Sequence, residues 1–535
     1  MAKSILPLLR SPPFAGVPVA VAAVSAPPLG DLPSLDEAVV EKVLAAVRGA
    51  ALGGAFWGVR ATPAEVVLRV PSHSNTPDIP LSALRLDRKI DRSARRAINP
   101  WSLLRPGVTL FADGDDEWAA IALLAGASVR IVSPGAFGAP GEDHATLRRR
   151  VAMHLLGCRY RDPFTQASCS LDEALAILML WRDVIAANRG IVAAAGMAWW
   201  KRAEIRRFLW TPQAPLRFLP AAKAIRHAAK GGGSVAIWPS RVTAAAIADA
   251  GARRVPLVQV EDGFVRSVGL GANLVPPLSV TVDRRGIHYD PSGASELETR
   301  LEQGPFPPAL LERAAALRTR IVVDRISKYG GAEDTPSPPR LTGRRLVLVP
   351  GQVEDDRSVL LGGGEVAGNL DLLRRVRATE PEAEIWFRPH PDVDAGHRRG
   401  GLRDVEALAH ADRVVRGGSM ASLLGEVDAV HVLTSLTGFE ALLRGREVVC
   451  HGTPFFAGWG LTRDLAAAPA RRGRRVTLDE LVAATLILYP RYLDPVTMLP
   501  CKPETLIARI AERPTARPGL LVRLRRLQGR LTQFI

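Results

Sequence analysis

The sequence predicts an α/β protein with two wound lobes and a cleft, preceded by a truncated repeat of the same module and a helical linker. From about residue 230 to 500, short apolar runs alternate with helical patterns, which is typical of parallel sheets covered by helices. A proline-rich hinge, TPSPPR (335–340), divides this alternation in two. Ligands of open α/β sheets bind beyond the carboxyl ends of strands, so motifs that follow strands are the functional candidates.

An internal repeat indicates a duplicated module. RYRDPFTQASC (159–169) and RYLDPVTMLPC (491–501) share Arg, Tyr, Asp, Pro, Thr and Cys at a single offset of 332 residues. A weaker match pairs residues 109–138 with 431–458. The first copy has far fewer residues before its marker than the second. We therefore expect it to be truncated and to lack chemistry of its own.

The chain divides into five predicted parts. They are a truncated first module (1–140), a helical linker (141–229), a first lobe (230–340), a second lobe (341–500) and a basic helical tail (501–535). Residues 171–210, within the linker, have helical periodicity and few breakers, which predicts two or three helices. Trp199, Trp200 and Trp210 either pack these helices against the next domain or anchor them at a membrane interface.

The elements of the two lobes are predicted in chain order. The first lobe has strands within 234–240, 255–260 and 277–283, a helix at 243–252, and a turn or short strand at 286–290. The second lobe has strands within 344–352, 383–391, 427–435 and 447–452, and helices at 368–381 and 438–445. Because helices separate most of these strands, we expect parallel sheets.

The composition limits the class of protein. Lys and Arg total 70 against 54 Asp and Glu, so the formal net charge is +16 and an acidic partner is favoured. No zinc-finger spacing or aromatic RNA-binding run is present, so nucleic acid is not the expected partner. The four cysteines form no CxxC pair, which fits a reducing cytoplasm. No stretch reaches the roughly 18 apolar residues of a transmembrane helix.

Each end of the chain allows two interpretations. Residues 1–30 combine early basic residues with an apolar run that prolines interrupt. We interpret them as a poorly structured or strand-containing segment, with a signal segment as the alternative. Residues 517–535 have apolar and Arg positions at helical spacing. They form either a helix on an anionic membrane surface or a helix that packs back on the module.

HVLTSLTGFEALLRG places hydroxyl groups where a helix begins. Ser435 and Thr437 can donate, with the amides of the helix N-terminus, to a phosphate. Gly438 permits close backbone approach, and Glu440 is placed to accept from ribose hydroxyls. A plain helix cap is the alternative interpretation. In the weaker match of the repeat, Asp116 stands opposite Ser435.

RPHP places Arg388 and His390 directly after a strand. Arginine is permanently charged and can hold a phosphate or a carboxylate. His390 stands between two prolines and can donate to a phosphate. A structural or solvated histidine is the alternative.

Two acidic turns also follow strands. EDGFVRS places Glu261 and Asp262 at a strand end, with Arg266 and Ser267 on the same loop. Paired carboxylates in a cleft suit general acid/base work, because repulsion separates their pKa values. GQVEDDRS carries three consecutive acids, 354–356, without the spaced ligands of a metal site. That stretch alone leaves a solvated loop and a catalytic loop equally open.

Together, these motifs resemble those of the capsular polysaccharide β-Kdo transferases, also called capsule synthesis or export proteins. The resemblance is carried by VEDGFVRSVGLGANLVPPLSVTVDRRGIHYD, GQVEDDRS, FRPHPD and TSLTGFEALLRGREVVCHGTPFFAGWGLT. It covers 230–500 densely, and 109–210 resembles the end of a first module and its linker. It implies a GT-B-like pair of Rossmann-type lobes and a retaining transferase. The family moves β-Kdo, an eight-carbon acidic sugar, from CMP-β-Kdo to a lipid-linked, Kdo-containing capsule primer.

The resemblance also implies residue roles. A double displacement needs a nucleophilic carboxylate and an acid/base group. The family keeps an Asp two residues before a Ser, which makes Asp356 the implied nucleophile and Asp355 its rival; Glu261 is the implied acid/base and Asp262 its rival. The implied catalytic groups are Asp356, Glu261, Asp262 and His390; the donor-binding groups are Arg388, Ser435, Thr437, Gly438, Glu440, Gln352 and Ser358; the acceptor-side groups are Arg266 and Ser267. No metal or other cofactor is expected, because CMP leaves with a single phosphate.

The implied partners are CMP-Kdo, a lipid-linked Kdo acceptor, the anionic inner-membrane surface and other capsule-assembly proteins. The implied location is the cytoplasm or the periphery of the inner membrane. Two-module members carry two motif sets, whereas this chain has one complete set, so we expect a single linkage type. Two alternatives remain open: a transferase for another CMP-activated ulosonic or sialic acid, and a non-catalytic polysaccharide export or binding component.

Overall fold

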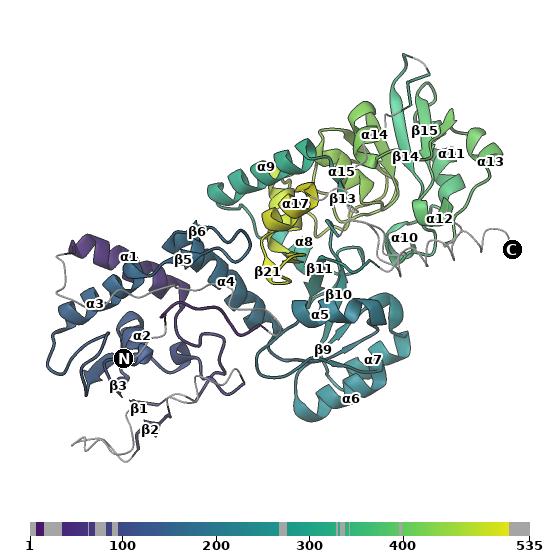
Figure 1. Cartoon of the computed structure of the whole chain (residues 1–535). Helices are drawn as coiled ribbons and strands as arrows, with labels where there is room; N and C mark the ends of the chain where they lie inside the picture. The colour runs from purple at the N-terminus through teal and green to yellow at the C-terminus, as the bar shows by residue number, and fades with distance from the viewer. Residues whose placement is uncertain are drawn as a thin grey trace. The chain divides into compact units, whose positions relative to one another are not determined.

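The chain forms two compact units, which are described separately (Figure 1). The first comprises Met1–Arg189, Leu209–Leu216 and Val496–Cys501, and the second comprises Gly190–Phe208, Arg217–Pro495 and Lys502–Ile535. The computed structural model describes residues 7–14, 35–62, 64–69, 82–87, 95–266, 275–327, 330–331, 338–341, 343–394 and 398–512.

The first unit contains a parallel sheet with the strand order β2-β1-β3-β4. The strands are β1 (Val66–Arg69), β2 (Leu84–Arg85), β3 (Thr109–Ala112) and β4 (Ser128–Ile131). The helices are α1 (Glu37–Ala50), η2 (Pro100–Ser102), α2 (Glu117–Ala125), α3 (His144–Gly157) and α4 (Leu171–Asn188). α2 connects β3 to β4, and its sequence EWAAIALLA is apolar on nearly every face, as expected of a helix buried on all sides.

The two copies of the repeated marker make the same hydrogen bond. In the first copy, β5 (Tyr160–Arg161) pairs with β6 (Ser168–Cys169), and the Tyr160 hydroxyl donates to the Leu155 carbonyl at 2.8 Å. In the second copy, the Tyr492 hydroxyl donates to the Leu486 carbonyl at 2.6 Å. Each tyrosine therefore ties its strand to the helical segment that precedes it.

The first sheet of the second unit has the order β20-β11-β10-β9-β7-β8. Its strands are β7 (Ile191–Ala195), β8 (Arg217–Phe218), β9 (Ser234–Ile237), β10 (Leu257–Asp262), β11 (Ser279–Asp283) and β20 (Pro490–Leu493). The helical segments around it are η3 (Trp199–Lys201), α5 (Arg202–Phe208), α6 (Ala221–Gly231), η4 (Pro239–Arg241), α7 (Ala244–Ala252), α8 (Glu296–Glu302) and α9 (Pro308–Val323). Apolar side chains of α6 and α7 pack with those of β7 and β9 into one core cluster.

Two sequence predictions for this sheet are confirmed only in part. Residues 171–210 contain the predicted helical segments, α4, η3 and α5, but β7 lies between α4 and η3 and joins the sheet beside β9. β11 is antiparallel to β10 and β20, whereas we predicted parallel strands. The alanines of β7 favour a helix locally, but strand pairing decides its structure.

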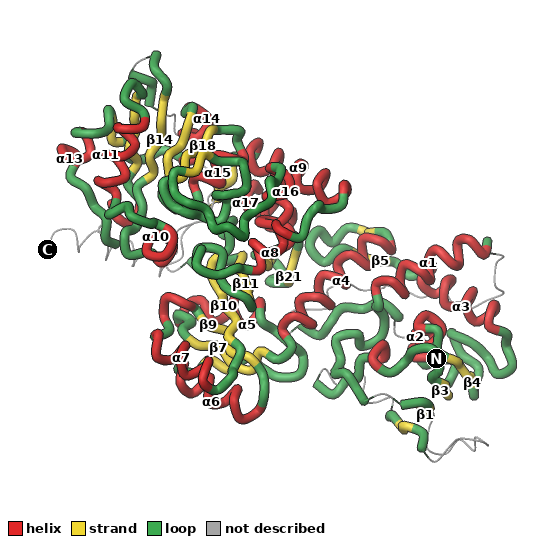
Figure 2. Tube along the Cα trace, turned by 180° about the vertical axis from the view of Figure 1, so that it is seen from behind, coloured by secondary structure: helices red, strands yellow, loops and turns green. Residues whose placement is uncertain are grey.

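The second sheet of this unit is parallel throughout, as predicted. The strand order is β16-β15-β14-β17-β18-β19. The strands are β14 (Leu346–Pro350), β15 (Glu384–Arg388), β16 (Arg413–Val414), β17 (Ala429–Val432), β18 (Glu447–Cys450) and β19 (Arg463–Asp464). The helices are α10 (Arg357–Gly362), α11 (Asn369–Thr379), α12 (Pro391–Asp394), α13 (Asp404–Leu408), α14 (Met420–Glu426) and α15 (Thr437–Leu443). Figure 2 shows its strands grouped apart from those of the first sheet.

The chain returns to the first sheet after completing the second. α16 (Leu478–Val482) and a π-helical segment (Ala483–Leu488) lead into β20, which pairs with β11. Residues 490–493, predicted within the second lobe, therefore belong to the sheet of the first. The remaining elements of this unit are β12 (Ile326–Ser327), β13 (Gly330–Gly331) and α17 (Pro503–Glu512). The predicted amphipathic stretch 517–535 lies outside the described residues.

Candidate active site

The carboxyl edge of the first sheet in the second unit gathers charged and aromatic side chains. β10 ends in Glu261 and Asp262. β7 leads into η3, which ends in Lys201, and β9 leads into Trp238. Because β7, β9 and β10 are parallel, these segments all leave the sheet at one edge. That edge is where ligands of α/β sheets bind.

Both carboxylate oxygens of Asp262 are engaged by cations. Lys201 Nζ lies 3.0 Å from Oδ1, and Arg266 Nε lies 2.7 Å from Oδ2. Burial alone would raise the pKa of Asp262, but the charges of Arg266 and Lys201 outweigh it and lower that pKa below its usual value. Asp262 is therefore held in its ionised form, with neither oxygen left to exchange a proton.

Glu261 is in a different state from its neighbour. Its Oε1 accepts a hydrogen bond from the Asp262 backbone amide at 3.1 Å. Burial, followed by the charge of Asp262, raises the pKa of Glu261 to about 7, although Lys201 acts in the opposite direction. A carboxyl group with a pKa near neutrality can both hold and release a proton during catalysis. The geometry therefore favours Glu261 over Asp262 as the acid/base group.

Asp356 caps the N-terminus of α10. Ser358 donates to Oδ1 twice, from its backbone amide at 3.0 Å and from its hydroxyl at 2.8 Å. The Asp-x-Ser spacing produces this turn locally, because a capping carboxylate reaches the amide two residues on. Within the described part of the chain, Oδ2 accepts no hydrogen bond. One oxygen thus orients the half-buried carboxylate, and the other remains for a ligand.

Asp356 and Glu261 influence each other although they come from the two different sheets. The charge of Asp356 is among the causes that raise the pKa of Glu261. Burial raises the pKa of the Tyr289 hydroxyl well above its usual value; Glu261 and Asp356 add to this increase, and Arg357 opposes it. Tyr289 and Arg357 therefore belong to the same site. Sequence reasoning quoted both within motifs but gave neither a role, because neither motif shows that the two residues meet.

The three consecutive acids of the α10 turn have different environments. Glu354 Oε1 accepts from the Asn369 backbone amide at 2.9 Å, at the start of α11. Asp355 is exposed and pairs with Arg398, whose Nη2 lies 3.1 Å from Oδ1. Glu354 therefore caps a helix, and Asp355 forms a surface ion pair. Asp356 is the acid whose charge reaches Glu261, so the structure favours it over Asp355.

Gln352 ties the ends of β14 and β17 together. The Thr434 amide and hydroxyl donate to Gln352 Oε1 at 3.0 and 3.1 Å. This fixes the side-chain amide, and its Nε2 is buried without an acceptor among the described residues. A buried donor without a partner is costly, and a bound ligand can satisfy it. Thr434, which the sequence analysis did not single out, sets this orientation.

α15 begins at Thr437, as predicted, but its hydroxyls bond to each other. Ser435 Oγ donates to Thr437 Oγ1 at 3.1 Å and accepts from the Thr437 amide at 3.3 Å. The cap position is Leu436, whose side chain makes no capping bond. The two hydroxyls therefore form a small polar pair at the start of the helix.

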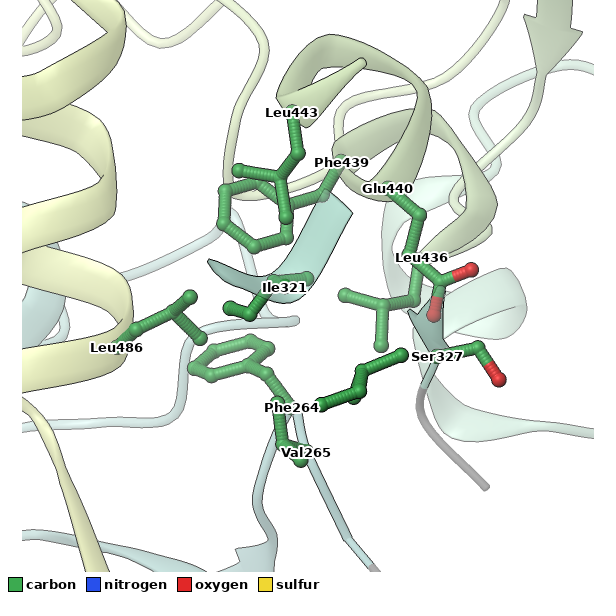
Figure 3. Close-up of a pocket in the computed structure, with 10 residues that line it drawn as sticks. Phe264, Val265, Ile321, Ser327, Leu436, Phe439, Glu440, Leu443 and Leu486 are labelled. Atoms are coloured by element: carbon green, nitrogen blue, oxygen red, sulfur yellow. The ribbon is translucent and has the colours of Figure 1, made fainter. Parts of the chain in front are cut away.

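Gly438 and Glu440 lie inside the packing of α15. A Cβ on Gly438 would lie 2.7 Å from the Phe456 ring, so the packing of that ring requires the glycine. Glu440 is 8% exposed and contributes to a small cavity. The cavity is lined by Phe264, Val265, Ile321, Ile326, Ser327, Leu436, Phe439, Glu440, Leu443 and Leu486. Figure 3 shows the Glu440 carboxylate and the Ser327 hydroxyl on the same side, with apolar side chains opposite.

Arg388 and His390 follow β15, as predicted. Arg388 donates to the Gly417 and Gly418 carbonyls at 2.5 and 2.8 Å, and it forms no ion pair within the described chain. Burial lowers the pKa of Arg388, because its charge is poorly solvated. His390 Nδ1 accepts from the Asp392 amide at 3.1 Å. In the neutral ring this acceptor role leaves the proton on Nε2, which can donate to an anion.

Of the two predicted acceptor-side residues, the structure describes Arg266 and not Ser267. Arg266 is 1% exposed, and its Nη2 donates to the Val275 carbonyl at 2.7 Å, so its guanidinium faces the interior of the lobe. Ser267 lies outside the described residues. Among the residues that the structure describes, no three His, Cys, Asp or Glu side chains are grouped to hold a metal ion. The helices described here also include none with the length and apolar character required to cross a membrane.

Comparisons with curated proteins identify relatives in capsule and lipopolysaccharide synthesis. LipA of Neisseria meningitidis serogroup A, a capsule polysaccharide modification protein, is 40% identical over 356 residues, which cover 66% of this chain and 50% of LipA. The lipopolysaccharide-processing protein LpsZ of Rhizobium meliloti is 48% identical over 246 residues, which cover 44% of this chain and 54% of LpsZ. The chain thus spans about half the length of the curated relatives it matches.

Two solved structures are similar to this chain over all or nearly all of their own length. The β-Kdo 2,7 transferase of Thermosulfurimonas dismutans KpsC is 31% identical with a TM-score of 0.51, and the match covers 61% of this chain and 100% of that one. The β-Kdo 2,4 transferase of the same KpsC is 34% identical with a TM-score of 0.52, and the match covers 60% and 98%. A family model described as capsule polysaccharide biosynthesis protein matches residues 233–492. The chain therefore belongs to the family of capsule polysaccharide biosynthesis proteins that includes the KpsC β-Kdo transferases.

Proposed function

We propose that this protein is a retaining glycosyltransferase that moves Kdo from CMP-β-Kdo to a Kdo-containing, lipid-linked acceptor in capsule synthesis. The observation that carries the proposal is the pair of carboxyl groups from two sheets. Glu261 has a pKa of about 7, and Asp356 has one oxygen without a hydrogen bond from the described chain. The similar KpsC structures are titled as β-Kdo transferases, which supports this sugar.

The first step of the proposed reaction uses Asp356 as nucleophile. Oδ2 attacks the anomeric carbon of Kdo while Ser358 holds Oδ1. A bond forms between Oδ2 and that carbon, and the bond from that carbon to the phosphate oxygen breaks. The phosphate oxygen keeps the electron pair, so CMP leaves and a glycosyl ester remains on Asp356.

The second step uses Glu261 as base. Its carboxylate takes the proton of an acceptor hydroxyl as that oxygen attacks the same carbon of Kdo. The bond to Asp356 breaks, and the carboxylate of Asp356 is regenerated. Each step inverts the carbon, so the two steps together retain its configuration.

The donor phosphate and the Kdo carboxylate need cationic or hydrogen-bonding partners. We assign this role to Arg388, which has no ion-pair partner in the described chain, and to His390. Gln352 Nε2, a buried donor without an acceptor, also fits the donor. Ser435, Thr437 and Glu440 are proposed to bind CMP, with Gly438 allowing α15 to pack. These groups supply charge without a metal, and we expect none to be required.

Several finer assignments belong to the same proposal. Because Arg266 is enclosed with Asp262, we reassign it from acceptor contact to support of the carboxylate pair. One complete motif set predicts one linkage type. A net charge of +16 suits an anionic donor, an acidic acceptor and an anionic membrane surface. The two Rossmann-type sheets are proposed to close on the donor in a GT-B-like arrangement.

The test is transfer from CMP-Kdo to synthetic or lipid-linked Kdo acceptors, followed by linkage analysis. Asp356→Asn should reduce transfer by roughly a thousandfold or more, because it removes the nucleophile. Asp355→Asn is the matched control, since Asp355 lies on the surface, and its activity should stay within about twofold of wild type. Transfer only from CMP-sialic acid would replace the donor in the proposal. Normal polysaccharide formation by Asp356→Asn would instead favour a non-catalytic binding role.

A further inference from the structure

Lys201 reaches the carboxylate pair from outside the segment that the family model matches. That segment is 233–492, whereas Lys201 ends η3, directly after β7. Its ammonium nevertheless lies 3.0 Å from Asp262 Oδ1. The side chain is 9% exposed, which is rare for a lysine.

Two indole rings surround the ammonium group. Nζ lies 3.5 Å from the centroid of the Trp238 ring and 5.1 Å from that of Trp200. Both distances are within the range of a cation–π attraction. The rings restrict where Nζ can lie, and Asp262 supplies the opposite charge. The ammonium is therefore fixed in position at the edge of the sheet.

We propose that Lys201 is a positioning residue for proton transfer: it fixes Asp262, whose amide holds Glu261, and places a positive charge beside the pair. The inference rests on the proposed function, because it assigns a role to Glu261 in that reaction. The contacts form a short chain from Lys201 Nζ to Asp262 Oδ1, and from the Asp262 amide to Glu261 Oε1 at 3.1 Å. Lys201 itself contacts no reacting atom.

The groups that act on Glu261 come from several elements. Asp262 shares its strand, Lys201 comes from η3, and Asp356 lies at the start of α10. Arg266 acts on Lys201 and Asp262 from the loop after β10, and Tyr289 responds to Glu261 from the segment after β11. Of the cations, Lys201 lowers the pKa of Glu261 directly. Removing its charge should therefore raise that pKa.

The test compares Lys201→Met with wild type. Methionine has a similar length and packs well against indoles, and Asp262 keeps Arg266 as its counter-charge. We expect turnover to fall roughly a hundredfold, because the acid/base group loses its fixed position. The rise of kcat/KM for the acceptor with pH, its acidic limb, should occur at a pH about one unit higher than in wild type. Lys223→Met, at an exposed site on α6, should change neither quantity.

Lys201→Arg and a direct titration complete the test. Lys201→Arg keeps the charge, so its acidic limb should stay at the wild-type pH even where turnover falls. If Lys201→Met does not fold, Lys201→Gln removes the charge but keeps a donor for Asp262 and carries the same prediction. The pKa of Glu261 is also measured by ¹³C NMR of labelled glutamate, assigned with Glu261→Gln.

The titration separates this inference from the proposed function. An unchanged pKa of Glu261 in Lys201→Met, or unchanged turnover and pH profile, would overturn the role of Lys201 even in an active transferase. A raised pKa in a protein that transfers no Kdo would support the role of Lys201 and reject the proposed function.

Discussion

The strand–helix–strand segments β3-α2-β4 and β17-α15-β18 have the same local topology but different turns. Both pairs of strands are parallel. In the first unit, Asp116 caps α2 through the Trp118 amide and pairs with Arg69, whose Nε lies 3.0 Å away; both side chains are at most 2% exposed. In the second unit, Ser435 and Thr437 bond mainly to each other, and α15 has no side-chain cap.

The difference separates a turn that serves the fold from a turn that keeps its polar groups for a ligand. In the first unit, the Asp116 carboxylate is already engaged by a helix amide and by Arg69. A pair of half-buried hydroxyls can exchange its mutual bond for bonds to a phosphate at little cost. We therefore expect substitutions in the first unit to affect stability. Substitutions near the two sheets of the second unit should affect activity.

Next to Asp356→Asn, the largest effect should come from Glu261→Gln. Transfer should fall roughly a thousandfold, within the range for loss of a general acid/base. In wild type, kcat/KM for the acceptor should rise with pH and level off above the pKa of Glu261, because this group must lose its proton; that pKa is about 7 while Asp356 is ionised and is lower once Asp356 carries the sugar. Glu261→Gln should lose this rise of kcat/KM with pH. The control variant Glu302→Gln, at an exposed site at the end of α8, should keep it. A limb that persists in Glu261→Gln would reject the assignment.

Asp116→Asn tests the first-unit side of the comparison. The free energy of unfolding should fall by about 3 kcal/mol, because Asp116 would lose the negative charge that pairs with the buried Arg69. Activity per folded molecule should be unchanged. Glu37→Gln, which removes one carboxylate of an exposed pair with Arg148, should cost less than about 1 kcal/mol. A loss of transfer in folded Asp116→Asn would show that the first unit contributes to chemistry.

Acid should destabilise the second unit more than the first. Burial, with the charge of its neighbour His451, lowers the pKa of His431 to about 3, and burial lowers that of His451 to about 4. In the unfolded chain these groups bind protons near pH 6.5, so stability is complete above that pH and decreases as pH falls toward 4. From pH 7 to 5, each histidine should cost about 2 kcal/mol. In the first unit, burial gives His154 a pKa of about 4.

Melting curves at pH 7 and 5 check this prediction. His451→Gln should flatten the pH dependence of the second unit, whereas His227→Gln on α6 should not. Equal acid sensitivity of the wild type and His451→Gln would contradict it.

The smallest effect should come from Ser435→Ala and Thr437→Ala. Each removes one hydroxyl proposed to contact the donor, so KM for CMP-Kdo should rise several-fold, corresponding to about 1 kcal/mol. Stability should change little, because the two hydroxyls bond mainly to each other and the cap position of α15, Leu436, makes no side-chain capping bond. Thr319→Ala, exposed on α9, serves as the control. If both variants keep the wild-type KM for CMP-Kdo, the turn before α15 does not bind the donor, and it resembles the turn before α2 in this respect.

The sequence predicted elements whose pattern is local. The strands and helices of the second sheet follow from alternating apolar runs, whereas the choice of Asp356 among three acids came from the resemblance to the family and its Asp-x-Ser pattern. It could not predict Lys201 near Asp262, because 61 residues separate them and only the pairing of β7 with β9 and β10 joins them. The alanine-rich β7 was predicted as helix for the same reason: its strand character comes from its neighbours.

The electrostatic link between Asp356 and Glu261 has a consequence for timing. While Asp356 is ionised, its charge raises the pKa of Glu261 and helps that group to keep its proton. Once Asp356 carries a sugar as an ester, its charge is gone and the pKa of Glu261 falls. Whether Asp356 carries a sugar therefore affects how readily Glu261 loses its proton. In the proposed reaction, Glu261 loses its proton more readily after a sugar has been loaded, so it is a better base for the acceptor in the second step than in the free enzyme.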